Sequence, residues 1–254
     1  MKCVLLAGGR GTRISEESQI RPKPMIEIGG KPILWHIMKH YAQHDVTDFI
    51  VCLGYKGYFI KEYFANYFLH NSDVTVDLAR NTIEYHTSRS EPWRVTLVDT
   101  GDATSTGGRL LRVRDHLGDA PFCFTYGDGV SDIDITAQRS FHDSHGLAVS
   151  MTVVAPPDPY GRTVVAGDRI VDFEEKPEGT TLINAGFFIV APSALDEIDG
   201  DESAWEREPL MRLSRRGQVA AWRHEGFWQC MDTVRDRQLL EELWDSGKAP
   251  WRTW

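Results

Sequence analysis

The sequence predicts an α/β fold with a central, mixed but mostly parallel sheet and helices on both of its faces. Short runs that are apolar at every position alternate with longer segments in which apolar residues recur every three or four positions. Continuous apolar runs are typical of parallel strands, which are buried on both faces. Their alternation with helices is the βαβ pattern of doubly wound sheets.

The first half of the chain contains three expected strands and two expected helices. We place the strands at Val4–Ala7, Phe49–Leu53 and Phe122–Tyr126. The first helix should span Pro32–His44, because its apolar residues fall on one face and proline suits a first turn. A second helix at about 57–69 has an aromatic stripe, which we assign to core packing rather than to a partner surface.

Residues 70–99 interrupt this pattern and predict an inserted hairpin or flap. Here Val74–Val76 and Val95–Val98 are expected as strands on either side of a polar stretch. After residue 146 the chain becomes richer in β-structure, and helices at about 204–216 and 233–246 form a C-terminal helical elaboration. No repeat or linker divides the chain, so we expect one domain. The later strands are expected at Leu147–Ala155, Thr163–Ala166, Arg169–Phe173 and Gly186–Ala191.

Composition limits the classes of function. With 41% hydrophobic and 26% charged residues among 254, the chain has the profile of a soluble globular protein. A net charge of −9 argues against a nucleic-acid partner, because such binding needs Lys and Arg to neutralise phosphates. The four cysteines form no C-x-x-C pair, so we expect reduced thiols in the cytoplasm. No apolar run is long enough for a signal peptide or a membrane span, so no membrane partner is expected.

A glycine-rich segment, L-A-G-G-R-G-T-R at residues 6–13, follows the first expected strand, and R-P-K-P occurs at 21–24. Its unobstructed backbone amides and the nearby cations Arg10, Arg13 and Lys23 suit a chain of phosphates. A dinucleotide fingerprint fits poorly, because Ile14 stands where the third glycine should be, and no G-x-x-x-x-G-K-[ST] motif is present. The segment therefore predicts phosphate binding.

This segment resembles the signature of the sugar-1-phosphate nucleotidyltransferases, L-A-G-G-x-G-T-R followed by K-P. The resemblance implies a Rossmann-like nucleotidyltransferase fold in a single domain, 1–254. Within it, 1–146 would be the nucleotide-binding part and 147–254 the sugar-phosphate-binding and C-terminal part. Relatives assemble, so a homo-oligomer is also implied, with a hexamer as the suggested form. Further matching motifs are I-G-G-K-P-I-L-W-H-I-M-K at 28–39, G-Y-K-G at 54–57, E-P-W at 91–93, V-D-T-G-D at 98–102, T-Y-G-D-G at 125–129, G-F-W-Q at 226–229 and A-P-W at 249–251.

The resemblance is strongest to members that transfer a cytidylyl group from CTP to α-D-glucose 1-phosphate, which gives CDP-glucose and pyrophosphate. The same chemistry with UTP or dTTP, or with another sugar 1-phosphate, stays an alternative. A nucleotide-sugar sensor without turnover is a third possibility from a different class. For CTP, an acceptor near Leu6 or in the 104–108 loop should face the cytosine amine.

Nucleotide binding is expected from two stretches of the chain. The segment 99–109 is a polar, glycine-containing loop that opens onto a helix, whose free amides suit a base edge or a phosphate. On spacing alone, a plain Ser/Thr-rich helix entrance is the favoured explanation. The residues that the resemblance assigns to the nucleotide are Leu6, Ala7, Gly8, Gly9, Arg10, Gly11, Thr12, Arg13, Lys23, Thr104, Thr106, Gly107, Arg109 and Asp128.

Two aspartates are the candidate ligands for Mg²⁺. Asp128 follows the strand Phe122–Tyr126, where ligands bind in open α/β sheets, although a D-G turn explains it equally on spacing alone. The resemblance implies that Asp128 and Asp232 hold the metal. Thr233 and Asp236 have capping-box spacing at the start of the last helix.

The sugar phosphate is assigned by resemblance alone to Glu175, Lys176, Asn184 and Gly186. Here Ala185 replaces a glycine of the family, and residues 159–163 also differ, so the sugar is the less defined substrate. Arg13, Lys23 and Lys176 are the expected catalytic residues.

His36 and His40 lie four residues apart, as zinc ligands can, but no third ligand accompanies them. Because they fall opposite the apolar face of their helix, we expect them to contact solvent or another subunit. Six of the eight tryptophans crowd the last fifty residues, which we assign to packing or to a subunit interface.

Overall fold

A seven-stranded sheet forms the centre of the molecule in the computed structural model, which describes residues 1–9, 11, 20–155, 162–166, 169–174 and 182–254. Four neighbouring strands run parallel, in the order β8, β1, β4 and β7. On the other side, β13 is antiparallel to both β8 and β10, and β14 is parallel to β10. The expected mixed, mostly parallel sheet is confirmed. In sheet order the strands are β14 (Val219–Arg223), β10 (Val149–Val154), β13 (Ile183–Val190), β8 (Phe122–Tyr126), β1 (Lys2–Leu6), β4 (Asp48–Leu53) and β7 (Arg94–Asp99).

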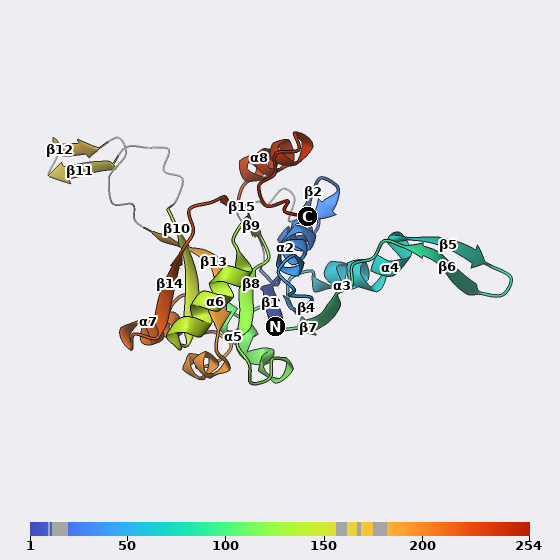
Figure 1. Cartoon of the computed structure of the whole chain (residues 1–254), viewed down its shortest axis with the longest axis horizontal. Helices are drawn as coiled ribbons and strands as arrows, with labels where there is room; N and C mark the ends of the chain where they lie inside the picture. Colours follow the sequence, from blue (N-terminus) through green and yellow to red (C-terminus); the bar gives the residue numbers. More distant parts are fainter. Residues whose placement is uncertain (10, 12–19, 156–161, 167–168, 175–181) are drawn as a thin grey trace.

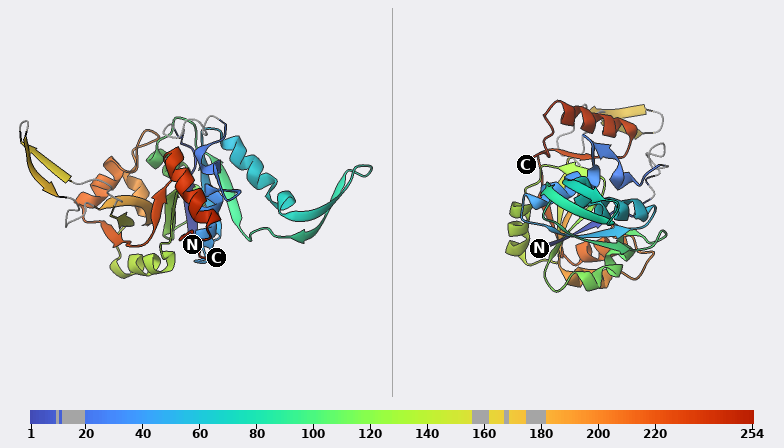
Figure 2. Two further views of the ribbon diagram at one scale, coloured as in Figure 1. Left: turned by 90° about the horizontal axis from the view of Figure 1, so that it is seen from above. Right: turned by 90° about the vertical axis from the view of Figure 1, so that its right-hand side faces the viewer.

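Helices cover both faces of this sheet, as the sequence predicts (Figures 1 and 2). Alternate side chains of β1 enter two separate cores, Cys3 and Leu5 on one face and Val4 and Leu6 on the other. This alternation follows from the two-residue period of a strand. The first core contains residues of α2 (Ile33–Ala42), α6 (Ile135–His145) and α8 (Val234–Asp245), and the second contains residues of α5 (Thr106–Arg112) and α7 (Glu208–Arg215).

The expectation that His36 and His40 face solvent or another subunit is wrong. Their side chains are 0% and 3% exposed, and the Nε2 atoms lie 2.8 Å from the carbonyl oxygens of Ile28 and Ile133. The rings of Trp244, Trp251 and Trp254 surround His36, so the C-terminal tryptophans cover the polar face of α2. Burial lowers the pKa of each imidazole to about 4, which keeps both rings neutral.

The inserted hairpin is present and contains the expected strand Val74–Val76, but its second strand is not the one expected. It consists of β5 (Ser72–Asp77) and β6 (Thr82–Ser88), which project from α3 (Gly57–Ala65) and α4 (Tyr67–His70) (Figure 1). Val95–Val98 instead belongs to β7, the edge strand that pairs with β4. Within α3 and α4, which are described in full, only Ile60 is buried, so the aromatic stripe is less buried than expected.

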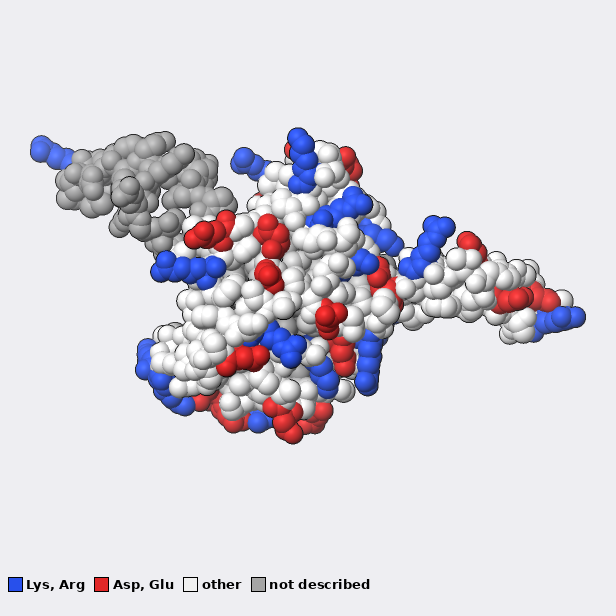
Figure 3. All heavy atoms as spheres, viewed as in Figure 1, with Lys and Arg blue, Asp and Glu red and all other residues white. Residues whose placement is uncertain are grey.

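Small ladders and turns complete the described part of the chain. Among them, β9 (Gly129–Ser131) pairs with β15 (Trp228–Cys230). Of the expected later strands, Thr163–Ala166 and Arg169–Phe173 form the hairpin of β11 (Arg162–Ala166) and β12 (Arg169–Glu174), and the other two occur as β10 and β13 of the central sheet. Among the described residues, none of the helices has the length and apolarity that crossing a bilayer requires. Both signs of charge are interspersed on the face shown in Figure 3. The remaining elements are η2 (Lys23–Met25), β2 (Glu27–Ile28), β3 (Lys31–Pro32), η3 (Arg114–His116) and η4 (Pro192–Glu197).

Candidate active site

A cavity of about 770 Å³ lies where β1 and β8 end and β13 begins. This position follows the rule that open α/β sheets bind ligands at the carboxyl ends of their parallel strands. Five predicted site residues, Arg10, Thr12, Arg13, Glu175 and Lys176, lie outside the described residues. The predicted site residues that line the cavity are Leu6, Gly8, Gly9, Gly11, Lys23, Thr104, Thr106, Arg109, Asp128, Asn184, Gly186 and Asp232.

Two predicted nucleotide-binding residues are held away from this cavity. The backbone N–H of Ala7 donates to the carbonyl of Cys52 at 3.0 Å, within the packing of β1 against β4. Gly107 packs so closely that a Cβ there would lie 2.6 Å from the carbonyl oxygen of Ser203. Both residues therefore support the cavity wall instead of lining the cavity.

Arg109 holds the glycine-rich segment by a hydrogen bond to its backbone. Its side chain is 5% exposed and donates from Nη1 to the Leu53 carbonyl at 2.9 Å and to Thr100 Oγ1 at 2.7 Å. Its Nη2 donates to the carbonyl of Gly8 at 3.1 Å. A Cβ at Gly8 would lie 2.2 Å from Nη1 of Arg109, which explains why glycine occupies this position. The guanidinium thus connects the ends of β1 and β4 through backbone carbonyls.

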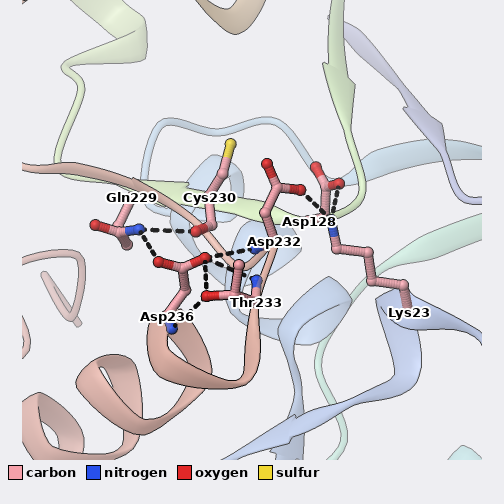
Figure 4. A network of polar contacts seen from close by, with 7 residues as sticks. All are labelled: Lys23, Asp128, Gln229, Cys230, Asp232, Thr233 and Asp236. Carbon is pink, nitrogen blue, oxygen red and sulfur yellow. Dashed lines mark hydrogen bonds and ion pairs between the residues drawn. The ribbon is translucent and has the colours of Figure 1, made fainter. Parts of the chain in front are cut away.

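Lys23, Asp128 and Asp232 form a charged cluster at the wall of the cavity (Figure 4). The Lys23 ammonium donates to Asp128 Oδ2 at 2.7 Å and to Asp232 Oδ1 at 2.6 Å. The Lys23 side chain is 8% exposed and each carboxylate is 27% exposed. Burial alone lowers the pKa of Lys23, but the two carboxylates outweigh burial and raise this pKa above its ordinary value.

The pairing of β9 with β15 brings the two aspartates together across more than a hundred residues of sequence. Gly129 lies opposite Cys230 in this ladder, and the N–H of Met231 donates to the carbonyl of Asp128 at 2.8 Å. Two carboxylates that share one cation are the oxygen donor set that Mg²⁺ takes from a protein, with substrate phosphates and waters completing its shell. The Lys23 ammonium lies between the two carboxylates, where it shows that they can share a cation, so the residues fit a divalent metal. Among the described residues, no group of three or more metal-ligating side chains is found.

The start of α8 holds Asp232 in place (Figure 4). Thr233 and Asp236 form the predicted capping box, which is confirmed. Asp236 Oδ2 also accepts the backbone N–H of Asp232 at 3.0 Å, while Gln229 Nε2 donates to Asp236 Oδ1 at 3.2 Å. The cap of this helix and the second carboxylate of the cluster are therefore one hydrogen-bonded unit.

The sequence analysis did not identify Tyr126 and Glu206, two further side chains of the cavity wall. The Glu206 carboxylate accepts hydrogen bonds from the hydroxyl groups of Tyr126 and of the predicted residue Thr106, the latter at 2.7 Å. Burial, followed by the charge of Glu206, raises the pKa of Tyr126 and keeps its phenol protonated. Glu206 precedes α7 as an ordinary exposed acidic residue, and nothing in the sequence marks it.

The start of β13 has a shaped backbone beside Trp228. Asn184 Oδ1 accepts the N–H of Gly186 at 2.8 Å, and Trp228 Nε1 donates to the carbonyl of Ala185 at 2.7 Å. Gly186 has a φ of +81°, and a Cβ there would lie 2.5 Å from the ring of Tyr126. Glycine is thus required at this position on two counts. The G-F-W-Q motif was the only sequence signal for Trp228.

Known proteins place this chain in a family. A family profile described as "Nucleotidyl transferase" matches residues 2–220. The chain is 57% identical over 256 residues to the glucose-1-phosphate cytidylyltransferase of Salmonella typhimurium, with complete coverage of both chains. It is 39% identical over 255 residues to a probable glucose-1-phosphate cytidylyltransferase of Bacillus subtilis, again over the full length of both.

Solved structures share the fold at low sequence identity. A putative glucose-1-phosphate thymidylyltransferase from Bacillus anthracis superposes with a TM-score of 0.69 at 18% identity, covering 96% of this chain and 94% of the other. A UDP-glucose pyrophosphorylase superposes with a TM-score of 0.70 at 15% identity, covering 97% of this chain and 98% of the other. The profile match, the full-length relatives and this shared fold agree, and the chain belongs to the nucleotidyl transferase family, among its sugar-1-phosphate nucleotidyltransferases.

Proposed function

We propose that the protein transfers a cytidylyl group from CTP to α-D-glucose 1-phosphate, which yields CDP-glucose and pyrophosphate. The observation that carries this proposal is the 57% identity to the Salmonella glucose-1-phosphate cytidylyltransferase over the whole of both chains. The cavity supports it independently, because a glycine-rich strand end, a buried lysine and two carboxylates converge there. These groups suit phosphoryl chemistry, in which positioning and charge stabilisation supply most of the catalysis.

The nucleophile needs no general base. A phosphate monoester has a second pKa near 6, so at neutral pH the sugar phosphate is already largely a dianion. The task of the protein is then to align a phosphate oxygen with the α-phosphorus, in line with departing pyrophosphate, and to offset the crowded negative charge. Of the described cations, Lys23 is the one that we assign to offsetting this charge, because its ammonium lies at the cavity wall.

The other catalytic roles are proposed from the resemblance. Arg13 and the glycine-rich segment would hold the leaving pyrophosphate, and Lys176 would align the attacking phosphate. Glu175 and Asn184 would hydrogen-bond the sugar hydroxyls. This assignment corresponds to the proposed division of the single domain into a nucleotide-binding part, 1–146, and a sugar-phosphate-binding and C-terminal part, 147–254.

Asp128 and Asp232 would hold Mg²⁺ in this reaction. When bound, the ion supplies positive charge to the phosphate oxygens without proton transfer. The two aspartates supply hard oxygen ligands at the point where Lys23 already neutralises part of their charge. We further propose a cytoplasmic homo-oligomer, in keeping with the buried thiols of Cys3, Cys52 and Cys123 and with the resemblance.

A matrix of nucleoside triphosphates against sugar 1-phosphates, scored for pyrophosphate release, tests the proposal. UTP presents a carbonyl where CTP presents an amine, so an acceptor facing the amine would be left unpaired. Such a loss amounts to about 1–3 kcal/mol, or about tenfold to a hundredfold in kcat/KM. We expect CTP to exceed UTP at least tenfold with glucose 1-phosphate.

Each other outcome of the matrix removes a defined part of the proposal. Equal use of CTP and UTP would contradict the cytosine assignment and leave nucleotidyl transfer intact. If no pair of substrates releases pyrophosphate above the rate without sugar phosphate, nucleotidyl transfer itself is refuted.

A further inference from the structure

The Lys23 ammonium occupies the space between the two carboxylates that would bind a metal. It lies 2.7 Å from an oxygen of Asp128 and 2.6 Å from an oxygen of Asp232. Its side chain is 8% exposed and donates hydrogen bonds to both carboxylates, so it is the resident cation of the cluster. The site is therefore built around a cation that belongs to the chain.

A divalent ion and this ammonium cannot use the same two carboxylates together. Mg²⁺ binds oxygens at about 2.0–2.1 Å and demands near-octahedral geometry. An ammonium within hydrogen-bond distance of both carboxylates would then stand only a few ångströms from the ion, with like charge and with ligand positions blocked. Lysine has a flexible four-carbon stem, so its ammonium can leave the carboxylates while the backbone of η2 stays in place.

The cavity offers the displaced ammonium a destination. Lys23 lines this cavity together with Gly8, Gly9 and Gly11, the segment whose amides suit phosphates. Phosphate oxygens placed there would compete with the aspartates for Lys23, and every step of Lys23 towards them would free the carboxylates.

We propose that Lys23 is an internal competitor of the metal, which closes the site of Asp128 and Asp232 until the phosphates of the nucleotide draw the ammonium away. Divalent metal alone then binds the free protein weakly, and metal and nucleotide enter with positive coupling. The identity of the nucleotide rests on the proposed function, whereas the competition between the two cations does not.

The first test measures Mn²⁺ binding to the free protein without nucleotide, by the electron paramagnetic resonance of unbound Mn²⁺. Lys23→Met keeps much of the side-chain length and removes the charge. We expect its Kd for Mn²⁺ to fall at least tenfold below that of the unmodified protein. Lys39→Met is the matched control, because Lys39 makes a half-buried ion pair with Glu91 at 2.8 Å, outside the cavity. Its Kd should be unchanged, and adding Asp128→Asn to Lys23→Met should abolish the gain.

A second measurement distinguishes displacement from a simple field effect of the lysine charge. In the unmodified protein, saturating Mn²⁺ should raise the rate at which an acetylating reagent modifies Lys23 several-fold, with Lys39 unchanged as internal control. Mass spectrometry of the digested protein reads both rates. If Lys23→Met folds poorly, Lys23→Gln replaces it in the binding test.

Either of two results overturns the proposal. One is a folded neutral variant that binds Mn²⁺ no tighter than the unmodified protein. The other is a Lys23 acetylation rate that Mn²⁺ does not change. Neither measurement involves turnover, so a failure here leaves the proposed reaction untouched, and the substrate matrix tests that reaction separately.

Discussion

Gly8 and Gly9 stand side by side in the glycine-rich segment, yet the structure predicts opposite consequences for Gly8→Ala and Gly9→Ala. A Cβ at Gly8 would lie 2.2 Å from Nη1 and 2.5 Å from Cζ of Arg109, and 2.9 Å from the backbone nitrogen of Gly54. A Cβ at Gly9 would meet nothing within 4 Å. The pair therefore compares a crowded position with an open one in the same segment.

The magnitude follows from what Arg109 would lose by moving. Arg109 is 5% exposed and its guanidinium donates to Leu53, Thr100 and Gly8, so the group cannot withdraw without breaking charge-assisted hydrogen bonds. Overpacking costs about 1–3 kcal/mol, and each lost bond to a charged group about 1.5–3 kcal/mol. We expect the free energy of unfolding to fall by about 2–4 kcal/mol in Gly8→Ala. For a chain of this size, this corresponds to a decrease in Tm of about 5–15 °C.

Thermal unfolding followed by circular dichroism measures both variants. Gly9→Ala should stay within about 0.5 kcal/mol of the unmodified protein. The clash with Arg109 is checked by a double-mutant cycle: in an Arg109→Ala background, the further cost of Gly8→Ala should be much smaller. Equal Tm values for the two glycine variants would refute the reasoning, as would additive effects in the cycle.

Three further predictions concern the helix cap, the buried histidines and the metal. Asp236→Ala should reduce turnover far more than Thr233→Ala, although each removes half of the capping box at about 1 kcal/mol, because of these two only Asp236 also accepts the backbone N–H of Asp232, the proposed second metal ligand; equal turnover at equal stability would exclude this positioning role. His36 and His40 have pKa values of about 4 when folded and about 6.5 when unfolded, so the unfolded chain takes up two more protons as the pH falls. The free energy of unfolding, measured in urea, should then reach its full value above pH 6.5 and be lower by about 4 kcal/mol at pH 5. If the pH dependence of this free energy is unchanged in His36→Gln, the lowered pKa of His36 is contradicted. Asp128→Asn should lower activity steeply, with only partial recovery in excess Mg²⁺, because the neutral amide binds a hard cation less well; an unaltered magnesium dependence would reduce Asp128 to a turn residue.

Local sequence patterns predicted the strands that are apolar at nearly every position. β1, β4 and β8 are apolar at nearly every position, and they occur where expected. β7 was misplaced in the hairpin because only its pairing with β4 shows that it belongs to the central sheet, and its sequence, R-V-T-L-V-D, does not reveal that partner. β14 was missed because its half-exposed sequence, V-A-A-W-R, has no clear apolar period.

The candidate site shows the same limit at the level of side chains. The glycine-rich segment was predicted as a phosphate site from a strand followed by glycines and nearby cations, which is a local signal. Asp128 follows a strand too, but its spacing fits a D-G turn equally well, and the resemblance assigned it to the metal. The approach of Asp232 to Asp128 depends on the β9–β15 ladder, which joins segments about a hundred residues apart. The polar face of α2 was expected to be exposed, because a helix wheel cannot show that tryptophans near the C-terminus will cover His36.

The charges of the cluster give a physical reason for the expected metal requirement. One ammonium and two carboxylates leave a net charge of −1 at the cavity wall (+1 − 2). Both proposed substrates are anions, and the protein itself has a net charge of −9, so this arrangement alone repels them. One bound divalent cation changes the cluster to +1, and the ammonium released from the aspartates then faces the phosphates instead of its own carboxylates. The same lysine thus keeps the empty cluster close to neutral and adds to the attraction of substrate once the metal is bound.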